Sequence, residues 1–209
     1  MMQFAQAAFS NAKGQEFYKL LGTGRDGFDP KPDFGVYAVL QVWKSEEAAN
    51  DFFNNARIIK KYRKKAAECY QIFMRNIAAR GKWDGQNPFR KSDDLDDTLT
   101  YAVITRATIK IRFLLRFWGF VPKSQQDLKT NTGLLFTKGI GEIPFKNMAT
   151  FSLWKDLDSL NKFAYQTEGH VKAIGKTREL GWYSEELFSR FQPYRSSGSW
   201  FGGNPLEKV

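Results

Sequence analysis

The 209-residue sequence has one cysteine, one histidine and no long apolar run. Because no stretch of 18 or more apolar residues exists, we expect no membrane-spanning helix. The lone Cys69 rules out an internal disulfide and fits a reducing cytoplasm. One cysteine and one histidine also cannot complete a zinc site without carboxylates. The first residues lack a charged n-region and an apolar h-region, which predicts no secretory signal.

What the sequence has in excess is aromatic residues and positive charge. Hydrophobic residues make up 42% and aromatic residues 16% of the chain, which favours a folded protein with ample core. The net charge of +10 calls for an anionic partner such as nucleic acid, a membrane surface or an acidic protein. Much of the charge lies in one segment, whose apolar residues fall at helical spacing. A solvated helix face is one interpretation, and docking on anionic lipid headgroups is the functional one that we prefer. The cations are Arg57, Lys60, Lys61, Arg63, Lys64 and Lys65, and the apolar stripe is Ile58, Ile59, Tyr62, Ala66 and Cys69.

An internal repeat divides the chain into two halves. Residues 37–45 (YAVLQVWKS) return as residues 148–156 (MATFSLWKD), at an offset of 111 positions. The same offset aligns Gly22 with Gly133. A period near 100 residues indicates two domain-sized halves rather than a solenoid.

Strands and helices alternate within each half. Each copy ends in Trp-Lys and is followed by an N-cap residue, Ser45 or Asp156, that begins a helix. This alternation predicts an α+β fold with two tandem ferredoxin-like βαββαβ halves that face each other. The halves are expected over residues 1–90 and 91–195, and a flexible tail over residues 196–209.

The second half opens with a clear strand near residues 98–111, where apolar and polar side chains alternate. Subtracting the offset puts the partner of this strand before residue 1. The N-terminal half is therefore expected to lack its first strand. We expect one of its sheet edges to be exposed or paired with another chain.

Two sequence motifs do not predict a catalytic or nucleotide-binding site. Residues 22–27 (GTGRDG) have the glycine spacing of a dinucleotide fingerprint, but Pro30 and Pro32 block the helix that must follow, so we reject that interpretation. Residues 184–186 (SEE) are expected to begin a short helix, where carboxylates favour the helix dipole.

His170 is the only place in this chain for histidine chemistry, and a neutral imidazole is a common iron ligand. Thr167 can cap a helix that runs to about residue 180 and holds His170 in its first turn. The residues that share its face are small and mostly apolar, which leaves room for a flat macrocycle above the imidazole. These residues are Ala173, Ile174 and Thr177. A packed or surface histidine without a ligand is the alternative.

Other residues could serve a large ligand near this histidine. Arg106, Lys138 and Arg178 are candidate cationic partners for the carboxylates of such a ligand. Large aromatic residues could supply apolar area, although most will belong to the core: Trp118, Phe136, Trp154, Phe163 and Trp182.

Several short strings and one long block carry a family resemblance. The strings are residues 17–24 (FYKLLGTG), 36–40 (VYAVL), 105–109 (TRATI), 116–118 (RFW), 139–144 (GIGEIP) and 150–154 (TFSLW). The block runs from His170 to Arg178 and continues over residues 181–191 (GWYSEELFSRF). Together they resemble the spheroidene monooxygenase family, haem-dependent carotenoid ketolases of bacterial pigment pathways, over about residues 17–192.

The resemblance implies a dimeric α+β-barrel type fold built from two ferredoxin-like halves, with haem b in the C-terminal half and His170 as the iron ligand. The helix-face residues Ala173, Ile174 and Thr177, together with Arg178, are then the candidate residues around the cofactor. The resemblance also implies that O2 is activated with electrons from an external donor and that a CH2 group of a carotenoid or similar polyene becomes a ketone. Arg106 is the candidate catalytic residue on the distal side. Because such a substrate is insoluble, we expect a cytoplasmic enzyme that is peripheral at the inner membrane surface.

Three alternatives remain open on the sequence alone. A haem dehydratase or peroxygenase could act on another apolar substrate, and a haem-binding or carrier protein could use the same pocket without catalysis. Nucleic-acid binding is disfavoured because the long strand offers only Arg106 and Lys110 on its polar face, where interleaved aromatic residues would be needed. We therefore expect an apolar small molecule and no nucleic acid as partner.

Overall fold

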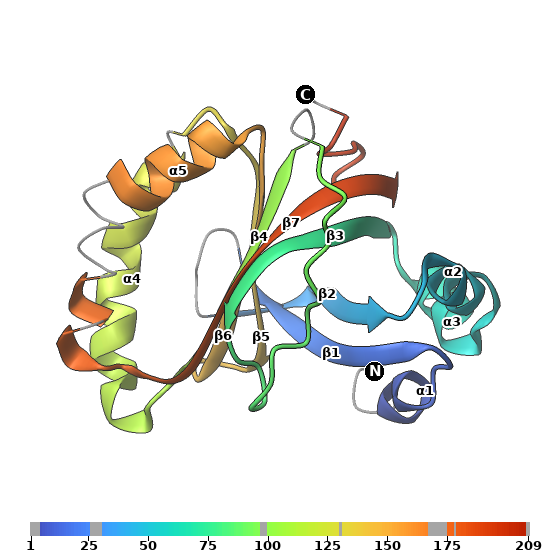
Figure 1. The fold of residues 1–209 in the computed structure, drawn as a ribbon. Coiled ribbons are helices and arrows are strands. Elements are labelled where there is room, and N and C mark those ends of the chain that lie inside the picture. The colour runs from blue at the N-terminus through green and yellow to red at the C-terminus, as the bar shows by residue number, and fades with distance from the viewer. Residues whose placement is uncertain are drawn as a thin grey trace.

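The computed structural model describes residues 5–25, 31–96, 100–129, 131–166, 175–177 and 179–207, with the backbone alone for 122–129. These residues form one antiparallel sheet with the strand order β2-β1-β5-β6-β4-β7-β3, flanked by helices (Figure 1). The elements are α1 (Gln6–Ser10), β1 (Gln15–Gly24), β2 (Pro32–Trp43), α2 (Glu46–Asn55), α3 (Arg57–Lys65), β3 (Tyr70–Gly81), β4 (Tyr101–Ile109), η2 (Ile111–Phe113), α4 (Leu114–Lys129), β5 (Leu134–Ile143), β6 (Asn147–Trp154), α5 (Leu157–Gln166) and β7 (Tyr183–Gly198).

The C-terminal half is a ferredoxin-like βαββαβ unit, as predicted. Its elements follow the order β4, α4, β5, β6, α5, β7, and its strands lie side by side as β5-β6-β4-β7. The strand expected near residues 98–111 is β4, which pairs antiparallel with both β6 and β7. Its position between two strands makes β4 the centre of this half.

The N-terminal half adds β1, β2 and β3 to the same sheet. β1 pairs with β5 through only two residue pairs, Gly22–Gly141 and Thr23–Ile140, while β3 pairs with β7 along most of its length. The two halves therefore share one curled sheet, and β2 and β3 form its two ends (Figure 1). In the described residues neither end strand has a second neighbour in the sheet order. Because residues 1–4 lie outside the described residues, the missing first strand stays a prediction, as does the dimer.

The repeat is confirmed for the helices that follow the Trp-Lys strands. α2 and α5 begin and end 111 positions apart. Both predicted N-caps are present, since Ser45 Oγ accepts a hydrogen bond from Ala48 N and Asp156 Oδ1 accepts one from Ser159 N at 2.7 Å. These helices and caps are the parts of the repeat that local sequence determines.

The offset fails for β1. Gly22, expected to match Gly133, lies instead opposite Gly141 at the corresponding end of β5, and Gly133 precedes β5. The first reason is the connection between strands, because β1 and β2 are joined by residues 25–31 whereas β5 and β6 are joined by the short turn 144–146. The second is that β2 begins farther from its shared end than β6 does, and the two differences together shift β1 out of the common offset.

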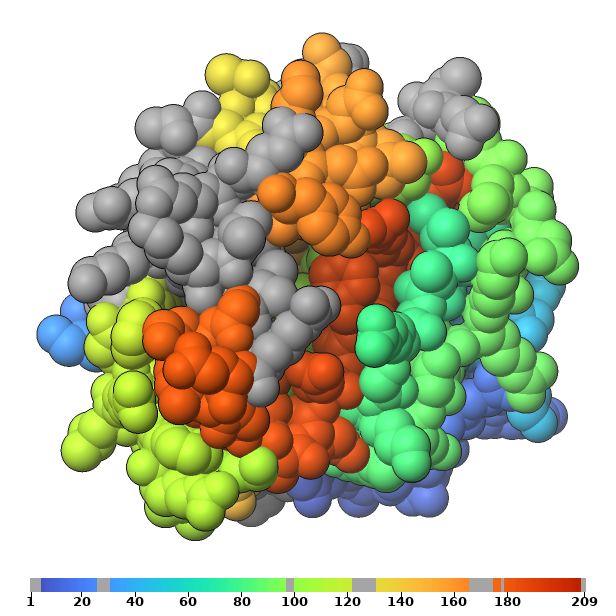
Figure 2. Space-filling model, turned by 60° about the vertical axis from the view of Figure 1, so that its left-hand side comes forward, coloured from blue at the N-terminus to red at the C-terminus, as the bar shows by residue number. Residues whose placement is uncertain are grey.

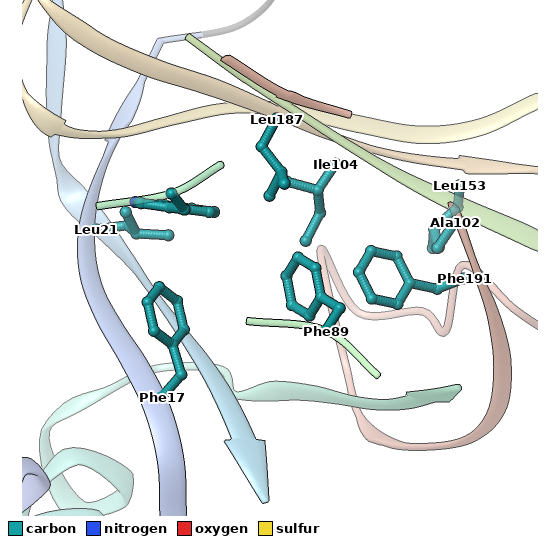
Figure 3. Close-up of a cluster of buried hydrophobic side chains, with 9 residues drawn as sticks. Phe17, Leu21, Phe89, Ala102, Ile104, Leu153, Leu187 and Phe191 are labelled. Atoms are coloured by element: carbon teal, nitrogen blue, oxygen red, sulfur yellow. The ribbon is translucent and has the colours of Figure 1, made fainter. Parts of the chain in front are cut away.

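The main core lies inside the curl of the sheet. Residues from both halves meet there, including Phe17 and Leu21 of β1 and Ile104 of β4 (Figure 3). Phe89 of the linker between β3 and β4 reaches the same cluster, where its ring packs edge-on against Phe191 of β7 at 4.9 Å. The linker is thus part of the core rather than a free connection.

Further contacts attach the β3–β4 linker to β1 and to β3. Arg90 forms an ion pair with Glu16 of β1 at 3.0 Å, and the Ser92 N–H donates to the Asn76 carbonyl of β3 at 2.8 Å. Glu16 and Asn76 belong to strands that lie near opposite ends of the sheet order. The linker therefore bridges two strands that do not pair with each other.

The predicted short helix at residues 184–186 is wrong. Glu185 and Glu186 belong to β7, where they lie opposite Thr108 and Ala107 of β4. A serine before two glutamates looks like a helix start because local preference alone is visible in the sequence. Pairing with a strand 75 to 80 residues away prevails over that preference, as the register of β4 with β7 shows.

The described part of residues 196–209 packs against the rest of the protein, whereas the sequence predicts a flexible tail there. The Trp200 ring packs edge-on against Phe136 at 5.2 Å, and Tyr70 Oη donates to Asn204 Oδ1 at 2.8 Å. Leu206 packs against the main core. Small polar residues and glycines make this segment look flexible in the sequence, but its few apolar side chains find distant partners.

Within the described residues, no helix is both long and apolar enough to cross a bilayer.

Candidate active site

Most of the predicted cofactor residues lie outside the described residues. These are His170, Ala173, Ile174 and Arg178. Thr177 is described and half-buried, and its carbonyl oxygen accepts a hydrogen bond from Gly181 N at 3.0 Å. The segment with His170 connects the end of α5 to the start of β7, so these two elements flank it along the chain.

Thr177 lies beside an aromatic cluster at the start of β7. Its side chain hydrogen-bonds Tyr183, whose ring packs against Phe117 of α4 at 6.0 Å. Burial raises the pKa of Tyr183, and the hydrogen bond from Thr177 works in the opposite direction. The phenol therefore stays protonated at neutral pH. Trp182 is fully buried in this cluster, and its indole nitrogen has no hydrogen-bond partner in the described residues.

β4 presents different side chains to its two faces. Tyr101 and Val103 pack against α5, and Ile109 packs against α4, so these residues define the outer, helix-covered face. Ile104 and Arg106 lie on the other face, because successive side chains of a strand alternate. Arg106 therefore points into the curl of the sheet.

Arg106 is 3% exposed and is surrounded by charged and aromatic groups. Its guanidinium forms an ion pair with Glu185, and its Nη2 lies 3.6 Å from Glu142 Oε2. The guanidinium also lies 5.5 Å from the ring centre of Trp83, whose indole N–H donates to Glu142 Oε2 at 3.1 Å. Lys19 Nζ lies 2.7 Å from Glu142 Oε1. We call Arg106, Glu142, Glu185, Trp83 and Lys19 the interior network.

The interior network shifts the pKa values of two members. Burial works to raise the pKa of Glu185, but hydrogen bonds from the backbone N–H groups of Gly85 and Asp84 and the nearby Arg106 outweigh it, so the pKa is lowered. Burial works to lower the pKa of Lys19, but its bonds to Asp84 and Glu142 outweigh it, so the pKa is raised. Both groups are therefore charged at neutral pH.

The predicted catalytic role of Arg106 does not follow from this geometry. Its guanidinium is held by two carboxylates and lies on the face of β4 opposite the residues that contact α4 and α5. Sequence reasoning misses its partners Glu142, Glu185 and Trp83, because contacts between distant strands leave no local pattern. The GIGEIP string that contains Glu142 gives no sign of these contacts.

A row of residues crosses the outer face at the middle of the C-terminal half. Gly139 of β5 pairs with Thr150 of β6, Thr150 pairs with Thr105 of β4, and Thr105 pairs with Phe188 of β7. Directly paired residues in antiparallel strands point to the same face. We call these four residues the outer row.

The outer row is less covered than the residues on either side of it. Thr105 is exposed although β4 is a central strand, and Phe188 is 38% exposed, whereas Val103 and Ala107 on the same face of β4 are buried. Figure 2 shows part of β7 open to view between α5 and β3. The helices thus cover the ends of the outer face more fully than its middle.

Arg190 adds a cation to this surface. It lies opposite Val103, and its guanidinium is 5.7 Å from the Phe188 ring centre. Its Nε is buried and has no hydrogen-bond partner in the described residues. A buried donor without a partner is costly, so an acceptor at this place would be stabilising.

These residues are compatible with a flat apolar cofactor. A glycine, two threonines and an aromatic ring form a surface with little relief, and Arg190 can pair with a carboxylate at its side. Within the described ranges no group of three or more histidine, cysteine, aspartate or glutamate side chains is arranged to hold a metal ion. The chain's only histidine is not among them.

Comparison with known sequences finds close relatives, although no protein-family model matches the chain. The chain is 39% identical over 194 residues to the spheroidene monooxygenase of Rhodobacter capsulatus, covering 91% of this chain and 80% of that protein. It is 37% identical over 193 residues to the Cereibacter sphaeroides protein of the same name, covering 91% and 60%. The Rubrivivax gelatinosus spheroidene monooxygenase is 34% identical over 190 residues, covering 90% and 73%.

Solved structures show more distant likeness. A crystal structure from Fusobacterium nucleatum, proposed to be a monooxygenase, aligns with a TM-score of 0.46 and 16% identity over 96% of this chain and 85% of that one. A similar proposed monooxygenase from Lactobacillus acidophilus gives a TM-score of 0.43 and 12% identity over 94% and 83%.

Proposed function

We propose that this chain, which belongs to the spheroidene monooxygenase family, is a haem-dependent monooxygenase that converts a CH2 group of a carotenoid or similar apolar polyene to a ketone. The observation that carries the proposal is the match to spheroidene monooxygenases along about nine-tenths of the chain. The outer row and Arg190 support it, because they offer a flat surface and a cation next to the elements that flank His170.

The outer face of the C-terminal half would hold haem b. His170, the only imidazole of the chain, would serve as the iron ligand. Ala173, Ile174 and Thr177 would contact the ring, and Arg178 and Arg190 would pair with its carboxylates. When bound, the haem supplies activation of O2, with electrons from an external donor.

The substrate chemistry requires two successive hydroxylations of one carbon. Each consumes one O2, two electrons and two protons, places one oxygen atom on the carbon and releases one water. The resulting geminal diol loses water and leaves the ketone. The protein's own residues would hold the polyene against the outer face, next to the aromatic cluster that contains Phe117 and Trp182. In this arrangement Arg106 has a positioning role, because it fixes β4 to β5 and β7 from the opposite face.

An absorption spectrum tests the cofactor. Protein expressed with haem supplied should show a Soret band, and His170→Ala should lose it. Cys69→Ser is the matched control, because Cys69 is exposed and carries the only thiol of the chain. A spectrum unchanged in His170→Ala, or lost in Cys69→Ser, would reject His170 as the ligand.

Incubation with a carotenoid, O2 and a reducing system tests the reaction. The expected product has one more oxygen and two fewer hydrogens than the substrate, and it should not form without O2. Haem-loaded protein that converts no carotenoid would favour a haem carrier. Conversion with peroxide but not with O2 and reductant would favour a peroxygenase.

A further inference from the structure

The end of the molecule where α4 begins carries exposed apolar side chains. Ile111 of η2 is 72% exposed and Leu115 of α4 is 93% exposed. Trp118 follows three residues later, so the three side chains share one helix face. Figure 1 shows this end of α4 near the turn that joins β5 and β6, and a hydrogen bond from Trp118 to Phe145 joins the two.

The β5–β6 turn extends the apolar surface. Ile143 and Phe145 are both exposed. The Trp118 ring lies 6.1 Å from the Phe145 ring, and its indole N–H donates to the Phe145 carbonyl oxygen at 3.0 Å. We call Ile111, Leu115, Trp118, Ile143 and Phe145 the apolar tip. A contiguous surface of large apolar side chains on one end of a protein marks a contact with a partner or a membrane.

Phe145 is held at this position against a backbone preference. Its φ is 66°, a left-handed conformation that bulky residues rarely adopt. Asparagine or glycine would fit the turn with less strain. An exposed phenylalanine at such a place suggests that its ring serves a contact outside the chain.

Cations flank the apolar tip. Arg112 is exposed between Ile111 and the start of α4, and Lys146 follows Phe145 in the turn. In the described part of the chain neither forms an ion pair, and the only close partner of the Arg112 guanidinium is the Phe113 ring at 4.8 Å. Unpaired cations around an apolar surface complement anionic headgroups around an apolar bilayer.

A small cavity opens beside the apolar tip. It has a volume of about 130 Å³, and Trp118 and Phe145 form part of its wall. Glycines from β1 and β5 form its floor, and two of them, Gly139 and Gly141, lie on the outer face of β5. Gly139 also belongs to the outer row, about 10 Å from Thr105 at the usual spacing of strands. The cavity therefore contacts both the apolar tip and one residue of the outer row.

The basic helix α3 is the rival docking surface. Its cations are exposed, but Ile58, Ile59 and Tyr62 face inward and pack against the cluster around Phe9. Interfacial binding uses apolar side chains that enter the bilayer as well as charge. α3 offers charge alone, whereas the apolar tip offers both.

We propose that the apolar tip inserts into the interface of an anionic lipid bilayer, with Arg112 and Lys146 at the level of the headgroups. The cavity beside the tip then receives an apolar chain from the bilayer and passes it toward the outer row. Bilayer docking goes beyond the proposed function and does not depend on it. Only the identity of the chain as a polyene rests on that function.

Sedimentation with vesicles tests the apolar contribution without any substrate. Wild-type protein should bind vesicles that contain phosphatidylglycerol in phosphatidylcholine. The double variant Leu115→Gln/Phe145→Asn should bind at least about tenfold more weakly, because two large apolar side chains no longer enter the interface. The matched control Tyr165→Gln/Phe201→Asn also changes two exposed large hydrophobic side chains, one of them at positive φ, and should bind like wild type.

Variants that remove charge distinguish vesicle binding through the apolar tip from binding through α3. Arg112→Gln/Lys146→Gln should lower affinity roughly 25-fold, since each cation near an anionic surface contributes about fivefold. Lys64→Gln/Lys65→Gln on α3 removes the same charge and should have a much smaller effect at an ionic strength where the Debye length is about 10 Å. Circular dichroism and thermal unfolding of every variant check that the fold is kept.

A fluorescent probe tests insertion itself. In a Cys69→Ser background, Leu115→Cys labelled with nitrobenzoxadiazole should shift its emission to shorter wavelength on vesicles and be quenched by nitroxide-labelled lipid chains. Lys64→Cys with the same label should not respond.

Several results would overturn the proposal. They are absence of binding to anionic vesicles, loss of binding in the α3 variant but not in the tip variants, or a blue shift at residue 64 but not at residue 115. A further contrary result is that RNA competes fully with vesicles while the Leu115→Gln/Phe145→Asn variant binds vesicles like wild type. That result would indicate that the positive charge serves nucleic-acid binding. Each of these results is independent of whether the protein binds haem.

Discussion

Gly22 of β1 lies directly opposite Gly141 of β5, and this pair begins the short contact that joins the two halves through these strands. The two glycines differ in their surroundings. A Cβ on Gly141 would lie 2.5 Å from the Asn147 carbonyl oxygen, whereas a Cβ on Gly22 would meet nothing closer than 3.8 Å. The close approach of backbone to backbone explains the glycine at 141.

Gly141→Ala should therefore destabilise the protein by about 1–3 kcal/mol, because backbone atoms must move to accommodate the methyl group. Gly22→Ala is the control and should change the free energy of unfolding by less than about 0.5 kcal/mol. Urea unfolding followed by circular dichroism measures both. Equal effects of the two substitutions would contradict the close approach of Gly141 to the Asn147 carbonyl.

Removal of the guanidinium from the interior network should be costly. Arg106→Met leaves Glu142 and Glu185 without their buried partner and should lower the free energy of unfolding by about 3 kcal/mol. Arg57→Met on the exposed face of α3 is the control and should have little effect. Addition of Glu185→Gln to Arg106→Met should recover part of the loss, and a strictly additive double variant would argue against the coupling.

The lowered pKa of Glu185 predicts a pH dependence of stability. A carboxyl group whose pKa is lower in the folded state than its usual 4.5 stabilises the fold fully above that value. This contribution is lost as the pH falls from about 4.5 through the folded pKa. Glu185→Gln should thus be less stable than wild type at pH 7, and the difference should shrink at pH 3. A difference that stays constant between these pH values would show that the charge of Glu185 contributes nothing.

The N-cap of α5 should contribute measurably. Asp156→Ala removes the acceptor for Ser159 N and should cost about 1 kcal/mol, whereas Asp156→Asn keeps an acceptor and should cost less. Thermal unfolding distinguishes the two. The backbone hydrogen bond from Ser159 lowers the pKa of Asp156, so the difference between wild type and Asp156→Asn should diminish in acid.

A bulky side chain in the outer row should interfere with cofactor binding. Thr105→Trp fills the exposed middle of the outer face and should reduce haem retention severalfold, as measured by the ratio of Soret to protein absorbance. Ser197→Trp, at an exposed position of β7 that pairs with Gln71 of β3, is the control. Full haem retention in Thr105→Trp would move the proposed cofactor away from the outer row.

The features that the sequence predicts well are those that local chemistry decides. Ser45 and Asp156 cap their helices because a side-chain oxygen and a nearby N–H are enough. The alternation near residue 101 predicts β4 because successive side chains of a strand point to opposite faces of the sheet. The repeat then supplies the order of elements in both halves.

The features that the sequence does not reveal depend on distant contacts. Glu185 resembles part of a helix start, but its partner Arg106 is 79 residues away. Trp200 lies in a segment whose composition predicts a free tail, although Phe136 holds it. The outer row likewise exists only after four strands are in register, so Thr105 and Phe188 carry no signal of their own.

The linker between β3 and β4 also affects how the chain reaches its native state. β3 pairs with β7, so that Tyr70 lies opposite Gly198, and the loop between them must close before that ladder can form. The C-terminal half contains its own complete set of strands, with much shorter separations between partners such as Ile140 and Ala149. Contacts between near neighbours in sequence form faster, so we expect this half to assemble before the ladder between β3 and β7 closes. Phe89 would then arrive with the linker, and β3 would add to an edge that already exists.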